Sequence, residues 1–128
     1  MKRITRDVHP TALRHLLARP RADLAFADGS VVDAAPVAFR FHAERYYVGV
    51  TAELIRRGVV AGARVALLLE AGWFWYELQS IRLRGTIRAA STVPSDVDAA
   101  LTWFEVEPRT LVAWDYGRLR EVDADAPR

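Results

Sequence analysis

Residues 36–57 read PVAFRFHAERYYVGVTAELIRR, and the fold is decided in this stretch. Apolar side chains alternate over residues 31–41, which is typical of a half-buried β-strand. A turn near residues 42–44 leads into a second β-prone run at residues 46–50. Residues 52–60 then carry apolar positions at helical spacing, with charged residues between them. The stretch therefore predicts strand, turn, strand and short helix.

The residues before this stretch predict a helix and a hairpin. Apolar residues recur at helical spacing over residues 10–18, and Pro20 ends the pattern, so a short amphipathic helix is expected there. A β-prone run containing Leu24 and Phe26 then reaches Asp28-Gly29, a strong turn signal between two strands. We therefore expect a three-stranded meander up to residue 50.

Further strands are predicted after the helix at residues 52–60. Ala61-Gly62 ends that helix, and residues 65–69 form a continuous β-prone run. After a turn at Ala71-Gly72, residues 73–89 have enough β-prone content for one bent strand or two short ones. Gly85 is the expected site of a bend or bulge in it.

The last third of the chain returns to a β pattern. A polar stretch at residues 91–98 precedes a β-prone region from Trp103 to Ala113, and the tail from residue 123 is expected to be frayed. Residues 1–128 thus predict one mainly β domain. It should contain six or seven antiparallel strands, in a barrel or sandwich, with two or three short helices.

Composition excludes several function classes. The chain has no cysteine, which removes disulfides, thiolate metal sites and cysteine nucleophiles. Its three histidines lack metal-motif spacing, so we predict no metal site. The formal net charge of +2 does not indicate nucleic-acid binding. Because neither a signal peptide nor a membrane-spanning run is visible, we expect a cytoplasmic protein.

The order of these features resembles the flavin-binding split barrels that include pyridoxamine-phosphate oxidase. The likeness extends over about residues 10–120 and consists in the order and spacing of several short motifs. They are a helix, Asp28-Gly29, Pro36-Val37-x-Phe39, residues 46–51 (YYVGVT), a basic helix, Arg64-Val65, Arg82-x-Arg84-Gly85, and Pro108 followed by Trp114 and Gly117-Arg118-Leu119. The resemblance implies a split barrel that dimerises and forms two flavin sites at the subunit interface.

The resemblance also implies a site for the flavin phosphate. In these barrels backbone groups at a strand end and two adjacent basic residues hold the phosphate, which corresponds here to Val50, Thr51, Arg56 and Arg57. Thr51 is also a suitable helix N-cap, and arginines near a helix start can grip an anion beside free N–H groups. The alternative is that both arginines are ordinary solvated side chains.

Other implied contacts concern the flavin ring. Gln79 or Ser80 matches a polar strand residue that reaches the ring: spacing to Gly85 favours Ser80, and side-chain chemistry favours Gln79. Trp114 matches a tryptophan near the flavin of the partner subunit. Two polar strand residues on opposite faces, and an aromatic of the core or interface, are the respective alternatives.

This chain departs from the oxidase at several positions. Its helix after Thr51 is about two residues shorter, Ile55 replaces a hydroxyl residue, and one extra residue lies between Gly29 and Pro36. Arginine also stands where the oxidase has a histidine in its closing segment, at Arg118-Leu119-Arg120. These differences leave the cofactor open and argue against pyridoxamine phosphate as the substrate.

Four consecutive aromatics at residues 73–76 suggest a subunit interface. If they lie in a strand, two rings face the core and two face outward, and the outward pair needs cover. Together with the Trp103–Trp114 region, they predict a homodimer. Packing of these rings inside one core is the alternative.

The sequence therefore favours an FMN-dependent oxidoreductase acting on an unidentified small molecule. The cofactor would supply the redox chemistry, which accounts for the lack of a recognisable catalytic acid or nucleophile. A deazaflavin-dependent reductase, a non-catalytic flavin- or ligand-binding protein, and a structural β-barrel dimer without cofactor are the alternatives.

Overall fold

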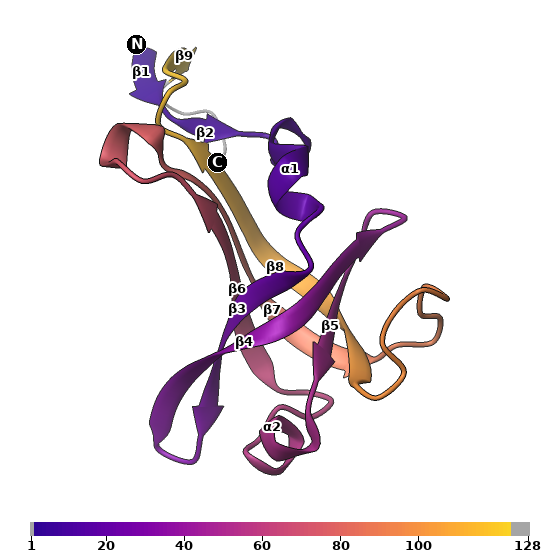
Figure 1. Ribbon diagram of the computed structural model, residues 1–128. Coiled ribbons are helices and arrows are strands. Elements are labelled where there is room, and N and C mark those ends of the chain that lie inside the picture. Colours follow the sequence, from indigo (N-terminus) through magenta and orange to yellow (C-terminus); the bar gives the residue numbers. More distant parts are fainter. Residues whose placement is uncertain (1, 124–128) are drawn as a thin grey trace.

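Six antiparallel strands close into a barrel in the computed structural model, which describes residues 2–123 (Figure 1). Their order is β8-β5-β4-β3-β6-β7, and pairing of β7 with β8 closes the ring. The mainly β fold class predicted from the sequence is confirmed. The strands are β3 (Arg21–Asp28), β4 (Val31–His42), β5 (Arg45–Val50), β6 (Arg64–Ala71), β7 (Gln79–Ala89) and β8 (Thr102–Asp115).

Short elements at the chain ends extend the barrel. β2 (Asp7–Val8) adds to the end of β8 as a further strand, and β1 (Lys2–Thr5) pairs with β9 (Arg120–Asp123). The tail expected to be frayed thus includes Asp123, which pairs with Lys2, and residues 124–128, which lie outside the described part. No helix within residues 2–123 has the length and apolarity needed to cross a bilayer.

The predicted first helix packs against the barrel through its leucines. It consists of a 3-10 turn, η1 (Pro10–Leu13), followed by α1 (Arg14–Leu17). Leu13, Leu16 and Leu17 are at most 4% exposed and pack into the same core as the inward side chains of the strands. Burial of each leucine contributes about 1.5–3 kcal/mol, which holds the apolar face of this amphipathic helix against the barrel.

Gly85 lies at a β-bulge, as predicted. The pairing of β7 with β8 shifts by one residue between Arg84 and Gly85, which leaves Arg109 as the extra residue on β8. Phe104 and Val106 face the core before the bulge, whereas Leu111 and Ala113 do so after it. The bulge therefore changes which alternate positions of β8 point inward. A Cβ on Gly85 would lie 2.0 Å from the backbone oxygen of Glu107, so only glycine fits.

The two turns of the meander are confirmed and differ in strain. Gly29, at the β3–β4 turn, has φ of +63°, which glycine adopts freely. Ala43 and Glu44, at the β4–β5 turn, have φ of 50° and 62°. Two positive φ values at the centre of a tight hairpin match the geometry of a type I′ turn, which normally selects Asn and Gly. The second turn is therefore strained in this chain.

The helix predicted over residues 52–60 is shorter than expected. α2 (Ala52–Arg56) ends because Gly58 adopts φ of +112°. Val59 N–H bonds to Leu54 O at 3.0 Å and Gly58 N–H bonds to Ile55 O at 3.2 Å, the pattern of a Schellman cap. Both Val59 and Leu54 are buried in the core. Gly58 rather than Gly62 thus terminates the helix.

The interpretation of residues 73–76 as strand is wrong. Gly72, at φ of +112°, ends β6, and the aromatics lie in a turn that includes η2 (Trp75–Glu77). The Glu77 carboxylate accepts from the N–H groups of Trp73 and Phe74, which holds the turn closed. None of the four rings enters the core: their exposed fractions range from 51% for Tyr76 to 90% for Trp73. We name residues 73–76 the aromatic turn.

Candidate functional site

The strand end predicted to receive a phosphate has the expected local structure. Val50 is buried at the end of β5, and Thr51 caps α2, its hydroxyl oxygen accepting from Leu54 N–H at 3.4 Å. The Thr51 hydroxyl is therefore already used within the chain. What this segment can offer an anion are the backbone N–H groups of the first turn and the basic side chains that follow.

The two adjacent arginines differ in the contacts they make. Arg57 Nε donates to Asp28 Oδ2 at 3.0 Å, and its Nη2 donates to Asp33 Oδ2. The same guanidinium lies 5.2 Å from the centre of the Phe26 ring. Arg57 is thus held against the β3–β4 hairpin by two carboxylates and an aromatic face.

This contact perturbs the ionisation of its members. The hydrogen bond from Arg57, with a further one from Ala34 N–H, lowers the pKa of Asp33 below its ordinary value. The two carboxylates in turn raise the pKa of Arg57, first through Asp33 and then through Asp28. Both shifts keep the groups charged. The positive charge of Arg57 is therefore already balanced by two carboxylates, which leaves less of it for an additional anion.

Arg56 is the arginine free to receive a phosphate. It is exposed at the last helical position of α2, and within residues 2–123 it forms no ion pair. The predicted pair therefore separates into one available cation, Arg56, and one structural cation, Arg57. Whether either binds phosphate stays a prediction.

Gln79 and Ser80 lie at the start of β7, at the end of the molecule opposite α2, and differ in exposure and hydrogen bonding. Gln79 is partly exposed; its Oε1 accepts from Nε2 of His15 at 2.7 Å, and its Nε2 donates to Asp115 Oδ2 at 3.2 Å. Ser80 is 8% exposed, and its hydroxyl finds no partner in the described part of the chain. Because Gln79 is the more accessible, it is the better placed of the two to meet a ligand.

Sequence reasoning missed the other members of this polar cluster. His15 comes from α1 and Asp115 from the end of β8, and only the fold brings them to Gln79. Asp115 is 7% exposed and also accepts from Gly117 N–H at 2.9 Å. Glu105, 6% exposed, is likewise buried, between Arg45 and Arg88. Both strand carboxylates are therefore held in buried polar contacts rather than on a solvated face.

Trp114 is opposite Ser80 in the register and half-buried. The Arg82 guanidinium lies 5.5 Å from its ring centre, so the indole carries a cation on one face. Trp103, by contrast, is used within the chain. The Trp103 ring packs directly on Gly49, since a Cβ added there would lie 2.7 Å from the ring. Its Nε1 donates to Asp98 O at 2.8 Å.

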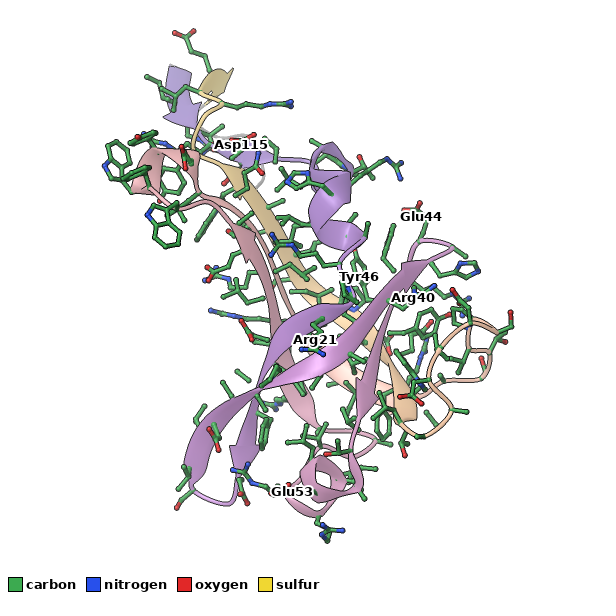
Figure 2. All side chains as sticks on the ribbon, in the orientation of Figure 1. Arg21, Arg40, Glu44, Tyr46, Glu53 and Asp115 are labelled. Carbon is green, nitrogen blue, oxygen red and sulfur yellow. The ribbon has the colours of Figure 1, made fainter. Side chains whose placement is uncertain are left out.

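The predicted cofactor residues thus fall into two groups at opposite ends of the barrel. Val50 pairs with Thr102 at the start of β8, whereas Gln79 pairs with Asp115 at the end of that strand. At ~3.3 Å per residue, thirteen steps along β8 correspond to roughly 40 Å of strand. Figure 2 places Glu53 of α2 and Asp115 at opposite ends of the molecule. Within one chain the structure therefore does not bring the two groups together.

Comparison with known proteins supports the fold. No protein-family model and no curated protein sequence matches the chain. Among solved structures, it is similar to an FAD-binding protein from Mycobacterium smegmatis, with TM-score 0.62, 15% identity, and coverage of 84% of this chain and 96% of that one. A candidate pyridoxamine 5'-phosphate oxidase from Corynebacterium glutamicum gives TM-score 0.62, 12% identity, and 95% and 98% coverage.

A third similar structure is named for a different cofactor. It is a haem-binding protein from Mycobacterium smegmatis, with TM-score 0.63, 12% identity, and coverage of 90% of this chain and 59% of that one. The chain has the split-barrel fold. At these identities the likeness shows the fold alone, and function must be argued from the residues.

Proposed function

We propose that this protein is a flavin-binding split barrel that works as a homodimer, with each cofactor site formed by residues of both subunits. The separation of the two groups of cofactor residues is the observation that supports this most directly. The Thr51–Arg56 segment and Gln79 with Trp114 lie too far apart for one chain to use both, and two chains packed side by side can bring one group of each together.

The residues fit a flavin mononucleotide in part. Arg56 is an unpaired cation next to a strand end, where it can hold a phosphate with charge-assisted hydrogen bonds. Gln79 presents an amide that can exchange its present partners, His15 and Asp115, for polar edges of a ring, and the half-buried Trp114 offers a flat apolar wall. Arg57 fits less well because two carboxylates occupy it.

FMN, when bound, supplies two-electron redox chemistry, and the chain's own residues bind and orient it. In the proposed site Arg56 anchors the phosphate, the backbone at Val50 and Thr51 fixes the depth of binding, and Gln79 and Trp114 set the position of the ring. We propose an oxidoreductase acting on a small molecule in the cytoplasm. Names of similar structures support a flavin, since one is an FAD-binding protein and another a candidate pyridoxamine-phosphate oxidase.

The exposed aromatic turn and two further exposed apolar side chains support the dimer. Four large rings with exposed fractions of 51% or more are unusual on a surface that stays in water. Ile4, at 67%, and Leu119, at 59%, are exposed as well. A second subunit that covers such rings would gain the apolar burial that stabilises interfaces.

Titration of the apo-protein tests cofactor binding. FMN, riboflavin and a deazaflavin are added to colourless protein, and binding is followed by quenching of flavin fluorescence. Saturable binding of FMN, tighter than that of riboflavin, is the expected result. Preference for the deazaflavin would favour the reductase alternative, and binding without reduction by a nicotinamide donor would favour a storage or sensing role. Failure to bind any of them would leave a structural barrel dimer.

Subunit mixing tests whether sites are shared. Arg56→Ala and Gln79→Ala variants are prepared as weakly binding homodimers and then mixed under conditions that exchange subunits. A heterodimer should regain one intact site of the two, because Arg56 of one chain meets Gln79 of the other. If mixing restores no binding although exchange has occurred, the site lies within one chain. Sedimentation at micromolar protein checks the dimer itself, and a monomer of 14.4 kDa would contradict it.

A further inference from the structure

The outer face of β3, β6, β7 and β8 carries a groove that the proposed flavin site does not use. Its volume is about 380 Å³, within the range of small-molecule sites. The groove is lined by Ala25, Phe26, Ala27, Val32, Arg64, Val65, Ala66, Arg84, Gly85, Thr86 and Arg109.

Small side chains on adjacent strands create the hollow. Ala25 pairs with Ala66 across β3 and β6, and Ala66 pairs with Arg84 across β6 and β7. Gly85, next along β7, adds no side chain at all. Alanine on two neighbouring strands leaves the sheet surface lower than its surroundings, so the floor of the groove is apolar and shallow.

Three arginines surround this floor. Arg64 belongs to β6 and Arg84 to β7, while Arg109 is the extra residue that the bulge inserts into β8. All three side chains belong to exposed residues. Thr110 is the β8 residue that pairs with Arg84, and the bulge inserts Arg109 directly before it, so two arginines lie at nearly the same height on neighbouring strands.

No carboxylate balances these arginines. The groove lining holds no Asp or Glu, and none of the three arginines forms an ion pair with another described residue. Several other arginines of the barrel are paired with carboxylates: Arg40 with Asp96, Arg45 and Arg88 with Glu105, and Arg118 with Asp115. This groove is therefore a local concentration of uncompensated positive charge around an apolar floor.

We infer that this groove is a second, separate site that binds a small organic anion, one with a phosphate or carboxylate group on a flat apolar body. Guanidiniums bind either group through paired hydrogen bonds, and the alanine floor accepts the apolar part. The inference rests on the groove alone and holds whether or not the protein binds flavin.

Phenyl phosphate is the probe, followed by NMR of the arginine Nε–H groups in the full chain. Saturable binding should shift the signals of Arg64, Arg84 and Arg109. Inorganic phosphate should bind more weakly because it leaves the floor uncovered, and phenol should not bind. Benzoate in place of phenyl phosphate tells whether the natural anion is closer to a carboxylate or a phosphate.

Substitution locates the site. Arg84→Gln with Arg109→Gln should weaken phenyl phosphate at least about tenfold, since two charge-assisted contacts are lost. Arg14→Gln, at an exposed arginine of α1, is the matched control and should bind as the parent does. The inference is overturned if the double variant retains the parent's affinity, if no saturable binding occurs, or if Arg56→Ala weakens phenyl phosphate as much as the double variant does, which would make the two sites one.

Discussion

Arg57 donates a hydrogen bond from Nε to Oδ2 of Asp28 over 3.0 Å, which ties the end of α2 to the β3–β4 hairpin. The two residues are 29 positions apart, and each belongs to its own local sequence motif. Asp28 belongs to the Asp-Gly turn, and Arg57 to the basic pair. Their contact leaves only Arg56 of the basic pair available to an anion, because Arg57 is already paired with carboxylates of the hairpin.

The first prediction concerns the pKa of Asp33, the second carboxylate on Arg57. Its pKa should lie below the ordinary aspartate value of about 3.9, mainly because Arg57 donates to it. A lowered pKa in the folded state stabilises the hairpin above pH ~4, and this contribution disappears as pH falls through the folded-state value. Titration of the carboxyl carbon by NMR measures it.

Arg57→Gln is the control for that titration. The pKa of Asp33 should rise most of the way to its ordinary value, and the remaining depression reports the hydrogen bond from Ala34 N–H. The pKa of Asp96, which a hydrogen bond from Arg40 lowers independently of Arg57, should not change. An unaltered Asp33 in the variant would show that Arg57 is not its main partner in solution.

The second prediction concerns Gly85 at the bulge. Gly85→Ala should destabilise the protein by roughly 3 kcal/mol or more, because the new Cβ would meet Glu107 O at 2.0 Å and neither backbone can move without breaking the β7–β8 ladder. Gly29→Ala, where no atom lies within 4 Å, carries only the strain of a positive φ and should cost about 1 kcal/mol. Urea unfolding compares the two, and equal losses would contradict the steric explanation.

Much of the barrel was predictable because its signals are local. Asp28-Gly29 marks a turn by itself, and alternation over residues 31–41 identifies a strand without knowledge of its neighbours. The aromatic turn was mispredicted since β propensity assumes that large rings find a surface to pack against. Here Gly72 and the Glu77 carboxylate close a turn instead, and the rings stay outside.

The third prediction uses the strained turn at Ala43 and Glu44. The double change Ala43→Asn and Glu44→Gly should stabilise the protein by about 1 kcal/mol, which corresponds to roughly 4 °C in Tm, because both residues suit positive φ. Ala43→Val should do the opposite, since a β-branched side chain tolerates this conformation least. Calorimetry of the three proteins checks the order, and a stabilising valine would refute the assigned turn geometry.

The candidate site was less predictable than the fold because it depends on distant contacts. Spacing from Thr51 identifies Arg56 and Arg57 as equals, yet only the folded chain reveals that carboxylates 24 and 29 residues away occupy one of them. Likewise, no local sequence pattern near Gln79 predicts its hydrogen bond with His15, 64 residues earlier. The groove arginines come from three strands, so no single motif contains them.

The final prediction separates the roles of the two arginines in flavin binding. Arg56→Ala should weaken FMN about ten- to a hundredfold, because it removes a contact contributing on the order of 1.5–3 kcal/mol. Arg57→Ala should weaken FMN over a similar range for a different reason, since it leaves Asp28 and Asp33 as uncompensated negative charges close to the phosphate. Fluorescence titration gives both affinities, with riboflavin as the control that lacks the phosphate.

Neutralising the hairpin distinguishes the two causes. In the Arg57→Ala background, Asp28→Asn with Asp33→Asn should restore most of the lost FMN affinity, because repulsion from the carboxylates is then gone. The same two changes added to Arg56→Ala should restore little, because the missing contact is still missing. If neutralisation rescues neither variant, Arg57 contacts the phosphate directly as the spacing predicts. If FMN binds equally to the parent and to both arginine variants, the phosphate site lies elsewhere. Riboflavin affinity should stay constant throughout, and a parallel loss would mean that the substitutions had damaged the pocket itself.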